Sequence, residues 1–228
     1  MDSVSLWTVP TDHVLPPVYE TILAADERAK AQRFHRPQAQ QRYRLVRVAL
    51  RLLLGKTLEW DPQKIQFKYS ANGKPSLAIP DLPIHFNVSH SGNYGLIGIA
   101  QHHPIGVDLE VMQPQKNFVK LAQRFFAPSE KAQLSVTTQE EQKTVFYQLW
   151  TAKEAFLKAT GLGISAGLNN VVLSPDLRSY QTLPHPYLVQ QWHLFSQPLF
   201  ANYWGAIALN NQENHSHSMI IQPYQWNE

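Results

Sequence analysis

Two short acidic motifs, one predicted on a strand and one on a helix, constrain most strongly how this chain can fold. Residues 105–110 read Ile-Gly-Val-Asp-Leu-Glu, and because side chains alternate across a strand, Asp108 and Glu110 would share one face. Residues 150–158 read Trp-Thr-Ala-Lys-Glu-Ala-Phe-Leu-Lys, in which Glu154 falls opposite the apolar stripe of a helix and Lys158 lies one turn further on. A fold that brings this strand and helix together collects three carboxylates and a lysine.

That combination of side chains suits one kind of chemistry. Three convergent carboxylates favour a hard, oxygen-binding cation such as Mg2+, and an adjacent lysine suits a phosphate that the cation bridges. Each piece is also common without any function, because such carboxylates often lie on a solvated strand face or helix surface. The order of four segments along the chain favours the functional interpretation: Phe-Asn-Val-Ser-His-Ser-Gly (86–92), Gly-Val-Asp-Leu-Glu (106–110), Arg-Phe-Phe-Ala-Pro-Ser-Glu (124–130) and Leu-Trp-Thr-Ala-Lys-Glu-Ala (149–155).

From about residue 25 to about residue 165, this series resembles the phosphopantetheinyl transferases, specifically the long, broad-specificity type that activates surfactin synthetase and other synthetases of secondary metabolism. The resemblance implies transfer of the phosphopantetheine arm of coenzyme A to a serine hydroxyl of an apo acyl- or peptidyl-carrier protein, with release of adenosine bisphosphate. It implies that Asp108, Glu110 and Glu154 hold Mg2+ against the pyrophosphate. Lys158 would contact a phosphoryl oxygen, and either Glu154 or a metal-bound water would accept the serine proton.

Composition limits the alternatives. The chain has 228 residues, 43% of them hydrophobic, which is enough for one large domain or two small ones. It contains no cysteine, so disulfides and cysteine-ligated zinc are excluded and an intracellular setting is expected. The apolar runs are too short to span a bilayer and no signal peptide opens the sequence, so we expect a cytoplasmic protein without membrane contacts. A net charge of +3 argues weakly for nucleic acid, which we do not expect as a partner, and is compatible with an acidic protein partner.

Turn residues and apolar periodicity divide the chain into two similar runs of elements. Helices are predicted at 26–33, 37–55, 117–126 and 139–160, and strands at 65–69, 76–79, 84–89, 94–100, 105–111 and near 170–174, 190–196 and 203–209. Glycines at 55 and near 161 are predicted to end the second and the last helix. We expect an α+β fold, with an N-terminal half at 1–103 and a C-terminal half at 104–228. The resemblance likewise implies two similar α+β halves related by a pseudo-twofold axis, with the metal site at the cleft between them.

The predicted helix at 37–55 carries one arginine in an unusual position. Arg44, Arg47 and Arg51 fall on a solvated face, whereas Arg42 falls within the apolar arc. A buried arginine requires a partner, so Arg42 either pairs with an internal carboxylate or binds an anion bidentately. The position that the resemblance gives Arg42 favours the anion. The other residues that the resemblance assigns to the phosphates or nucleotide of coenzyme A are Lys30, Arg33, Lys74, Ser89 and His90.

For two of the regions assigned to coenzyme A, the sequence leaves another interpretation open. The segment around Ser89 and His90 could be a hydrogen-bonded turn instead of a binding loop that offers hydroxyls, backbone N–H groups and an imidazole. Close relatives add a lysine three positions before Lys30, where this chain has Glu27 followed by Arg28, so the phosphate contacts at this corner are left open.

A basic face predicts where the partner docks. Lys116, Lys120 and Arg124 recur every four residues, with Phe118 beside them, which places three positive charges along one side of a helix. The alternative is a solvated basic face over a core stripe. Carrier proteins of this kind are acidic, which favours docking of the carrier on this helix, and we expect the enzyme to act as a monomer.

Two other functions use the same residues. A Mg2+-dependent phosphohydrolase or nuclease would employ the same carboxylates with water as the nucleophile. In a non-catalytic binding module the acidic groups would be structural. The first alternative predicts turnover without a carrier protein, and the second predicts no Mg2+-dependent binding of coenzyme A.

Overall fold

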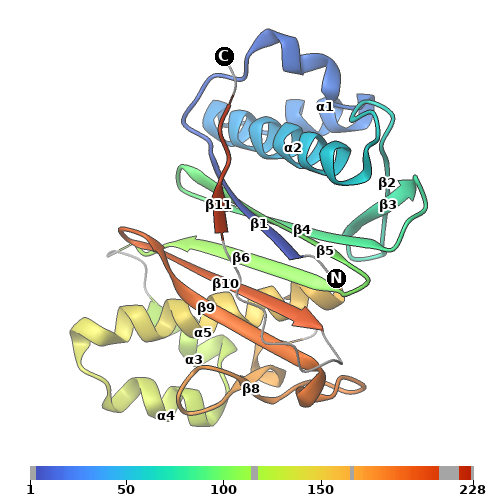
Figure 1. Cartoon of the computed structure of the whole chain (residues 1–228). Helices are drawn as coiled ribbons and strands as arrows, with labels where there is room; N and C mark the ends of the chain where they lie inside the picture. The colour runs from blue at the N-terminus through green and yellow to red at the C-terminus, as the bar shows by residue number, and fades with distance from the viewer. Residues whose placement is uncertain (1–3, 114–117, 165–166, 211–220, 227–228) are drawn as a thin grey trace. The chain divides into compact units, whose positions relative to one another are not determined.

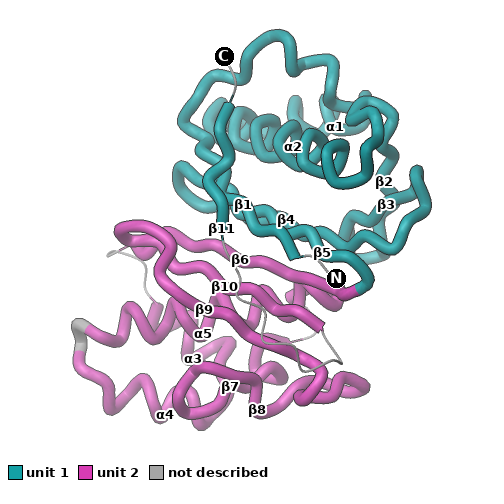
Figure 2. The backbone as a smooth tube through the Cα atoms, viewed as in Figure 1, with its two compact units in different colours: residues 1–102, 218–228 teal, residues 103–217 magenta. Residues whose placement is uncertain are grey.

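The polypeptide forms two units, each built on one long helix and a sheet, which is mixed in the first unit and antiparallel in the second. A computed structural model describes residues 4–113, 118–164, 167–210 and 221–226. The first unit contains Met1–His102 and Ser218–Glu228, and the second contains His103–His217 (Figure 2). The long helix has 22 residues in each unit. This arrangement confirms the predicted α+β class. Every helix within the described residues is too short or too polar to cross a lipid bilayer.

The sheet of the first unit has the strand order β11-β1-β5-β4. Its strands are β1 (Val4–Pro10), β4 (Ile84–Ser91), β5 (Tyr94–Gln101) and β11 (Ile221–Pro223). The helices are α1 (Ala25–Gln32) and α2 (Pro37–Leu58), preceded by a 3-10 helix, η1 (Pro17–Ile22), and β2 (Gln66–Tyr69) pairs with β3 (Pro75–Ile79) as a hairpin. Helix α2 lies over one face of the sheet (Figure 1), and its apolar side forms a core with the strands.

The end of the chain returns to the first unit, although the sequence assigned all of residues 104–228 to the second half. Strand β11 pairs in parallel with β1, with Leu6 opposite Ile221. The indole nitrogen of Trp226 then donates a hydrogen bond to the carbonyl of Pro10 at 3.1 Å, and its ring lies 5.9 Å from that of Tyr19. Neither β1 nor β11 was predicted; β11 has only three residues, too few to show a periodicity of its own.

The prediction that α2 ends at Gly55 is wrong. The helix continues to Leu58, and Glu59 adopts the left-handed conformation that closes it, with φ of 51°. A Cβ atom at Gly55 would lie 2.7 Å from Cγ of Pro62 and 2.8 Å from the carbonyl oxygen of Trp60. This glycine is therefore required for close packing of the following loop, and not for the turn that ends the helix.

The second unit has a three-stranded antiparallel sheet in the order β6-β10-β9, formed by β6 (Ile105–Val111), β9 (Trp192–Phe200) and β10 (Tyr203–Asn210). Its helices are α3 (Phe118–Phe125), α4 (Pro128–Val136) and α5 (Gln139–Thr160), and the short strands β7 (Val172–Leu173) and β8 (Tyr180–Thr182) form a separate pair. Helix α5 ends at Gly161 in the left-handed conformation, as predicted. It lies against the sheet, with α3 and α4 on its other side (Figure 1).

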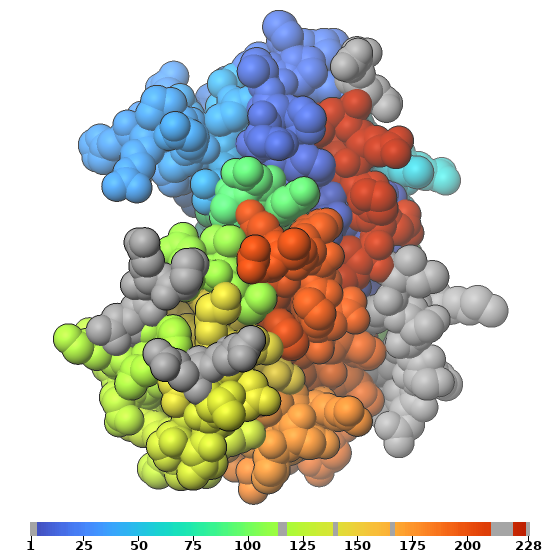
Figure 3. Space-filling view, turned by 90° about the vertical axis from the view of Figure 1, so that its left-hand side faces the viewer, coloured from blue at the N-terminus to red at the C-terminus, as the bar shows by residue number. Residues whose placement is uncertain are grey.

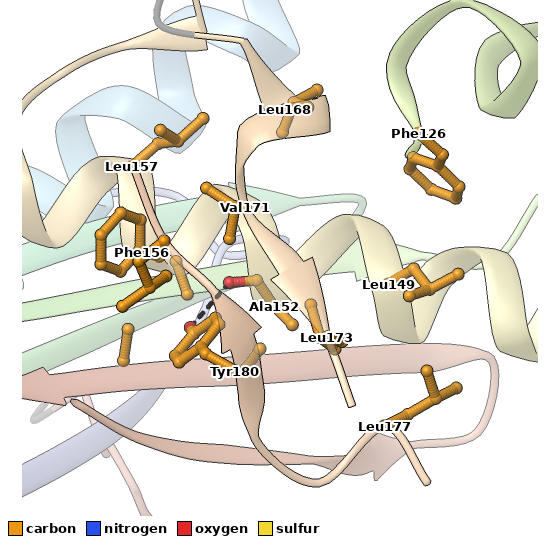
Figure 4. Packing of buried hydrophobic residues seen from close by; sticks show 14 of the residues in the cluster. Phe126, Leu149, Ala152, Phe156, Leu157, Leu168, Val171, Leu173, Leu177 and Tyr180 are labelled. Carbon is orange, nitrogen blue, oxygen red and sulfur yellow. Dashed lines mark hydrogen bonds between the residues drawn. The ribbon is translucent and has the colours of Figure 1, made fainter. Parts of the chain in front are cut away.

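Helix α5 is consequently buried on several sides and not only along the predicted apolar stripe, so Glu154, which lies opposite that stripe, is buried as well. Its side chains from Phe146 to Leu157 include buried residues all around the helix axis. Figure 4 shows Leu149, Phe156 and Leu157 on α5 packed among the side chains of the β7–β8 segment. Because layers of structure cover both sides of α5, a polar residue on the side away from the apolar stripe is also enclosed.

Candidate functional site

The predicted acidic strand and helix lie directly against each other in the second unit. A Cβ atom at Gly106 on β6 would clash with the backbone of Ala155 and Ala159 on α5, so the strand approaches the helix where no side chain separates them. Side chains alternate across the strand, so Asp108 and Glu110 project from the same face as Gly106, toward α5. The glycine thereby determines how closely the carboxylates of β6 approach the side chains of α5.

Asp108 is paired with the lysine of the helical motif. The Nζ atom of Lys158 donates to Oδ1 of Asp108 at 2.5 Å. Only 3% of Asp108 is exposed, whereas 30% of the Lys158 side chain remains accessible. The pair joins β6 to α5, and the Lys158 side chain remains partly accessible to solvent.

Glu154 lies in an environment that is unfavourable for a negative charge. It is 8% exposed, and its pKa is raised to about 7, first by burial and then by the nearby charges of Asp108 and Glu110, with Lys158 acting in the opposite direction. Within the part of the chain that the structure describes, the Oε1 atom of Glu154 is buried and has no hydrogen-bond partner. The carboxylates are therefore close enough to influence one another, and Asp108 and Glu154 are both buried.

The donor chemistry fits Mg2+, although the described residues contain no group of three histidine, aspartate or glutamate side chains arranged to hold a metal ion. Mg2+ usually takes one or two carboxylates from the protein and completes its octahedron with waters and substrate phosphates. A buried Glu154 oxygen that has no partner among the described residues, beside Asp108, supplies such a donor set without requiring three preassembled carboxylates.

One residue that lies near this cluster was not expected from the sequence. Tyr147 of α5 is fully buried, and its hydroxyl accepts a hydrogen bond from the backbone N–H of Gln113 at 3.1 Å. Burial raises the pKa of the Tyr147 hydroxyl, and the charge of Glu110 contributes in the same direction. Tyr147 ties the segment after β6 to α5, but it lies outside the four recognisable segments and reads as an ordinary core aromatic.

The proposed coenzyme residues of the first unit are partly brought together around a pocket. A hollow of about 560 Å³ is lined by Asp26, Ala29, Lys30, Arg33, Phe34 and Tyr69. A second hollow of about 230 Å³ shares Lys30, Phe34 and Tyr69 with the first, and it is also lined by Tyr43, Arg47 and His90. The structure therefore places Lys30, Arg33 and His90 around one continuous region and leaves all three exposed.

The other three coenzyme candidates do not line these hollows. Ser89 is buried, and Lys74 is partly buried, which lowers its pKa to about 8. Arg42 is also partly buried, and its Nε atom has no hydrogen-bond partner among the described residues. Of the two alternatives for Arg42, no ion pair with an internal carboxylate occurs in the described part of the chain.

The prediction that Arg47 and Arg51 lie on a solvated face is wrong. Both are buried, and the Nε atoms of both donate to Glu27 of α1 at 2.6 Å. Arg47 also donates through Nη2 to the hydroxyl of Tyr69 at 2.7 Å, and Arg51 donates to the carbonyl of Ile65 at 3.0 Å. One carboxylate from a neighbouring helix therefore allows two arginines to be buried on a side of α2 that the sequence pattern marks as polar.

This network also explains why the chain has Glu27 at the position where close relatives have a lysine. The Glu27 side chain is completely buried, and it accepts a hydrogen bond from the backbone N–H of Ala24 at 2.9 Å, which caps α1. Arg28 next to it donates to the carbonyl of Leu23. Glu27 therefore has a structural role inside the unit, and it does not face the hollows that Lys30 lines.

The predicted docking helix is α3, which has an exposed polar side. Lys120, Gln123 and Arg124 are exposed, together with 51% of Val119. Phe118 instead packs inward, with its ring 5.7 Å from that of Phe146. Lys116 lies outside the described residues. In Figure 3, α3 and α4 contribute the yellow-green to yellow part of the surface of this unit.

Comparisons with known proteins match both units. A family model described as the 4'-phosphopantetheinyl transferase superfamily matches residues 104–208, and one described as 4'-phosphopantetheinyl transferase, N-terminal, matches residues 7–102. A protein of Synechocystis, whose name assigns it provisionally to the 4'-phosphopantetheinyl transferases, is 48% identical over 97% of this chain and 94% of its own length. The transferase HetI of Nostoc is 38% identical over 72% of this chain and 71% of its own. The transferase Sfp of Bacillus subtilis is 35% identical over 67% of this chain and 66% of its own length.

Proposed function

This chain belongs to the 4'-phosphopantetheinyl transferases, and on that premise we propose which of its residues carry out the reaction. The protein transfers the phosphopantetheine arm of coenzyme A to a carrier protein. In the proposed reaction, a serine hydroxyl of the carrier attacks the phosphorus that bears the pantetheine arm. A new P–O bond forms to the serine, the P–O bond within the pyrophosphate breaks, and adenosine bisphosphate leaves. The serine proton must pass to a base.

The single observation that carries the assignment is the state of Glu154. It is a nearly buried carboxylate with a pKa of about 7, one oxygen without a hydrogen-bond partner among the described residues, and the Asp108–Lys158 pair beside it. A base is most effective when its pKa lies near the working pH, because it is then available in its charged form and still accepts a proton readily. This pKa belongs to the protein without a metal, and Mg2+ bound to Glu154 would lower it, so Glu154 and a metal-bound water are both proposed acceptors of the serine proton.

Mg2+ is the proposed metal, and Asp108, Glu110 and Glu154 are its proposed ligands. When bound, the metal would neutralise the negative charge that develops on the leaving phosphate. The Nζ atom of Lys158 lies 2.5 Å from Oδ1 of Asp108, and the charge of this partly accessible side chain suits it to contact a phosphoryl oxygen.

In the first unit, Lys30, Arg33 and His90 are the best supported of the proposed coenzyme contacts. They are exposed around hollows of about 560 and 230 Å³, and their charges suit phosphate groups. Arg42, Lys74 and Ser89 remain proposed contacts that rest on their positions in the sequence. The unpartnered Nε atom of Arg42 supports its assignment among the described residues.

The carrier protein is proposed to dock near Lys116, Phe118, Lys120 and Arg124. Exposure of Lys120 and Arg124 supports this surface, and the exposed Val119 next to Lys120 can supply an apolar contact. Because Phe118 packs inward, its contribution would be to hold α3 in place. Opposite charge would mainly speed the encounter with an acidic carrier.

The proposed function is tested by incubating the protein with coenzyme A, Mg2+ and a panel of apo carrier proteins, followed by mass measurement of the carriers. The expected result is a mass increase equal to one phosphopantetheine, absent with Asp108→Asn and retained with Asp81→Asn, a surface aspartate of the first unit that lies 3.8 Å from Lys68. Consumption of coenzyme A without any carrier would instead indicate a phosphohydrolase. Failure of every carrier, together with failure to bind coenzyme A, would refute the assignment.

Docking is tested separately with Lys120→Gln/Arg124→Gln. We expect slower modification at low carrier concentration, a weaker dependence on salt and unchanged binding of coenzyme A. Lys56→Gln/Lys64→Gln removes the same charge from exposed positions of the first unit and serves as the control. Equal rates for the two double variants at low salt would place the docking surface elsewhere.

A further inference from the structure

A buried ion pair lies next to the proposed catalytic carboxylate and takes no part in the proposed reaction. Lys153 directly precedes Glu154 on α5 and is fully buried, so it cannot reach a phosphate. Its Nζ atom lies 2.7 Å from Oε2 of Glu130, which is 2% exposed and belongs to the first turn of α4. The proposed reaction leaves both charges without a chemical role, so their presence beside Glu154 requires another explanation.

Every polar atom of this pair is engaged in a contact that joins separate segments. Lys153 also donates to the carbonyl of Leu168 at 3.1 Å and to the carbonyl of Val171. Glu130 accepts hydrogen bonds from the backbone N–H of Leu173 at 3.1 Å and from the backbone N–H of Ala127, at the start of α4, at 3.0 Å. The pair therefore connects the middle of α5 to the start of α4 and to residues 168–173.

Tyr180 of β8 provides a second contact at the same turn of α5. Its hydroxyl donates to the carbonyl of Ala152 at 2.9 Å, the contact drawn as a dashed line in Figure 4. The Tyr180 ring packs on Phe156 with their centres 5.5 Å apart. Helix α5 is thus held from outside at Ala152 and Lys153, immediately before Glu154.

The opposite side of the same turn is fixed by β6. The missing side chain of Gly106 lets the strand touch the backbone of Ala155, immediately after Glu154. The residues on both sides of Glu154 in the sequence are therefore each in contact with a different part of the unit. Such support from surrounding residues is what holds a catalytic side chain within the small tolerance that its geometry requires.

Stability alone does not account for a buried ion pair at this place. Replacing such a pair by apolar residues of similar size is often neutral or stabilising, because both charges must be removed from water. Hydrogen bonds differ from apolar contacts in that they fix direction as well as distance. The charges that shift the pKa of Glu154 are those of Asp108, Glu110 and Lys158, so we expect the pair to act on Glu154 through the backbone of α5.

We propose that Tyr180 and the Glu130–Lys153 pair are positioning residues for Glu154: they fix the turn of α5 that carries it and thereby orient its carboxylate toward the metal and the serine proton. This inference rests on the proposed role of Glu154. None of the three residues touches the coenzyme or the carrier in this assignment. Their effect should appear in kcat and in metal affinity, and not in the KM for coenzyme A.

The experiment compares two tyrosines that pack on the same ring. Tyr180→Phe removes only the hydroxyl that binds Ala152. Tyr187→Phe is the matched control, because the Tyr187 ring lies 5.4 Å from that of Phe156 and its hydroxyl makes no hydrogen bond to α5 within the described part of the chain. Glu130→Gln/Lys153→Met removes both buried charges together, so no lone charge is left inside.

We expect kcat to fall about tenfold in Tyr180→Phe and about 100-fold in the double variant, with the KM for coenzyme A within about twofold of wild type. Mn2+ binding in the presence of coenzyme A, measured without any carrier, should weaken in the same order. Tyr187→Phe should change neither quantity. Melting temperatures recorded on the same samples show whether each variant is folded.

Two results would overturn the inference. One is equal kcat and equal Mn2+ affinity in Tyr180→Phe and Tyr187→Phe. The other is a lower melting temperature in Tyr180→Phe with wild-type kcat and Mn2+ affinity, which would make the contact purely structural. A wild-type protein that binds Mn2+ and coenzyme A but modifies no carrier would contradict the proposed function, and the Mn2+ affinities would still decide the positioning role.

Discussion

Replacing Glu154 by glutamine should abolish transfer and at the same time stabilise the metal-free protein at alkaline pH. Burial and the neighbouring carboxylates raise the pKa of Glu154 from 4.5 to about 7 in the folded protein. The folded state therefore holds the Glu154 proton more tightly than the unfolded state does. The contribution of this proton to stability is complete below pH 4.5 and is lost as the pH rises through about 7.

The size of the effect follows from the two pKa values. The interval between 4.5 and about 7, at about 1.36 kcal/mol for each pH unit, corresponds to about 3 kcal/mol. Glutamine has the same shape as protonated glutamate and cannot ionise. The Glu154→Gln variant and the wild type should therefore have similar stability at about pH 4, and the variant should be more stable by about 3 kcal/mol at about pH 8.

The measurement is urea denaturation at pH 4, 5.5, 7 and 8 in buffers that contain a chelator. Glu59→Gln removes the same charge from an exposed position and is the control for net charge. Adding Mg2+ and coenzyme A at pH 8 should stabilise the wild type more than Glu154→Gln, because only the wild type offers the carboxylate to the metal. Transfer to a carrier should be lost in Glu154→Gln and retained in Glu59→Gln.

The reasoning would be refuted by a stability difference between wild type and Glu154→Gln that stays constant from pH 4 to pH 8. It would also be refuted if Glu154→Gln were the less stable protein at pH 8. Either result would mean that the Glu154 carboxylate is well solvated or well paired in solution.

Three further perturbations test other parts of the structure. Arg47→Ala should lower the free energy of unfolding by about 3 kcal/mol in urea denaturation, because it removes one of the two arginines that pair with the buried carboxylate of Glu27; a loss below about 1 kcal/mol would contradict this burial. Gly106→Ala should prevent β6 from lying against α5 and so reduce both stability and transfer, whereas a soluble variant with normal melting temperature and rate would show that the close contact with Ala155 is absent. Burial lowers the pKa of Lys74 to about 8, so this side chain is charged below pH 8. If Lys74 binds a phosphate, the affinity of the wild type for coenzyme A, measured by calorimetry, should fall between pH 7 and 9. In Lys74→Met this part of the pH dependence should be absent.

Much of the local structure follows from the sequence. The alternation in residues 105–111 defines β6, and the apolar periodicity up to the left-handed Gly161 defines α5 within the bounds that the structure gives. These signals are local, because the periodicity of an element depends on its own residues and on the face that it buries. That these two elements meet was implied only by the resemblance to the family.

The burial of individual charges could not be read in the same way. The pattern of α2 marks Arg47 and Arg51 as solvated, and only the approach of Glu27 from α1 shows that they are inside. In the same way, the sequence of α5 shows one apolar stripe, and only the tertiary structure shows that α3, α4 and the β7–β8 segment cover its other sides.

The sequence by itself determined which residues of this protein carry charge, which positions share a face of β6 or α5, and where most helices and strands lie. The tertiary structure decided which of those charges are removed from water and which partners they find, as it did for Glu154, for Lys153 with Glu130, and for β11 beside β1. The physical reason is that the free energy of a charge depends on its surroundings in space, and those surroundings come from segments that are distant along the chain.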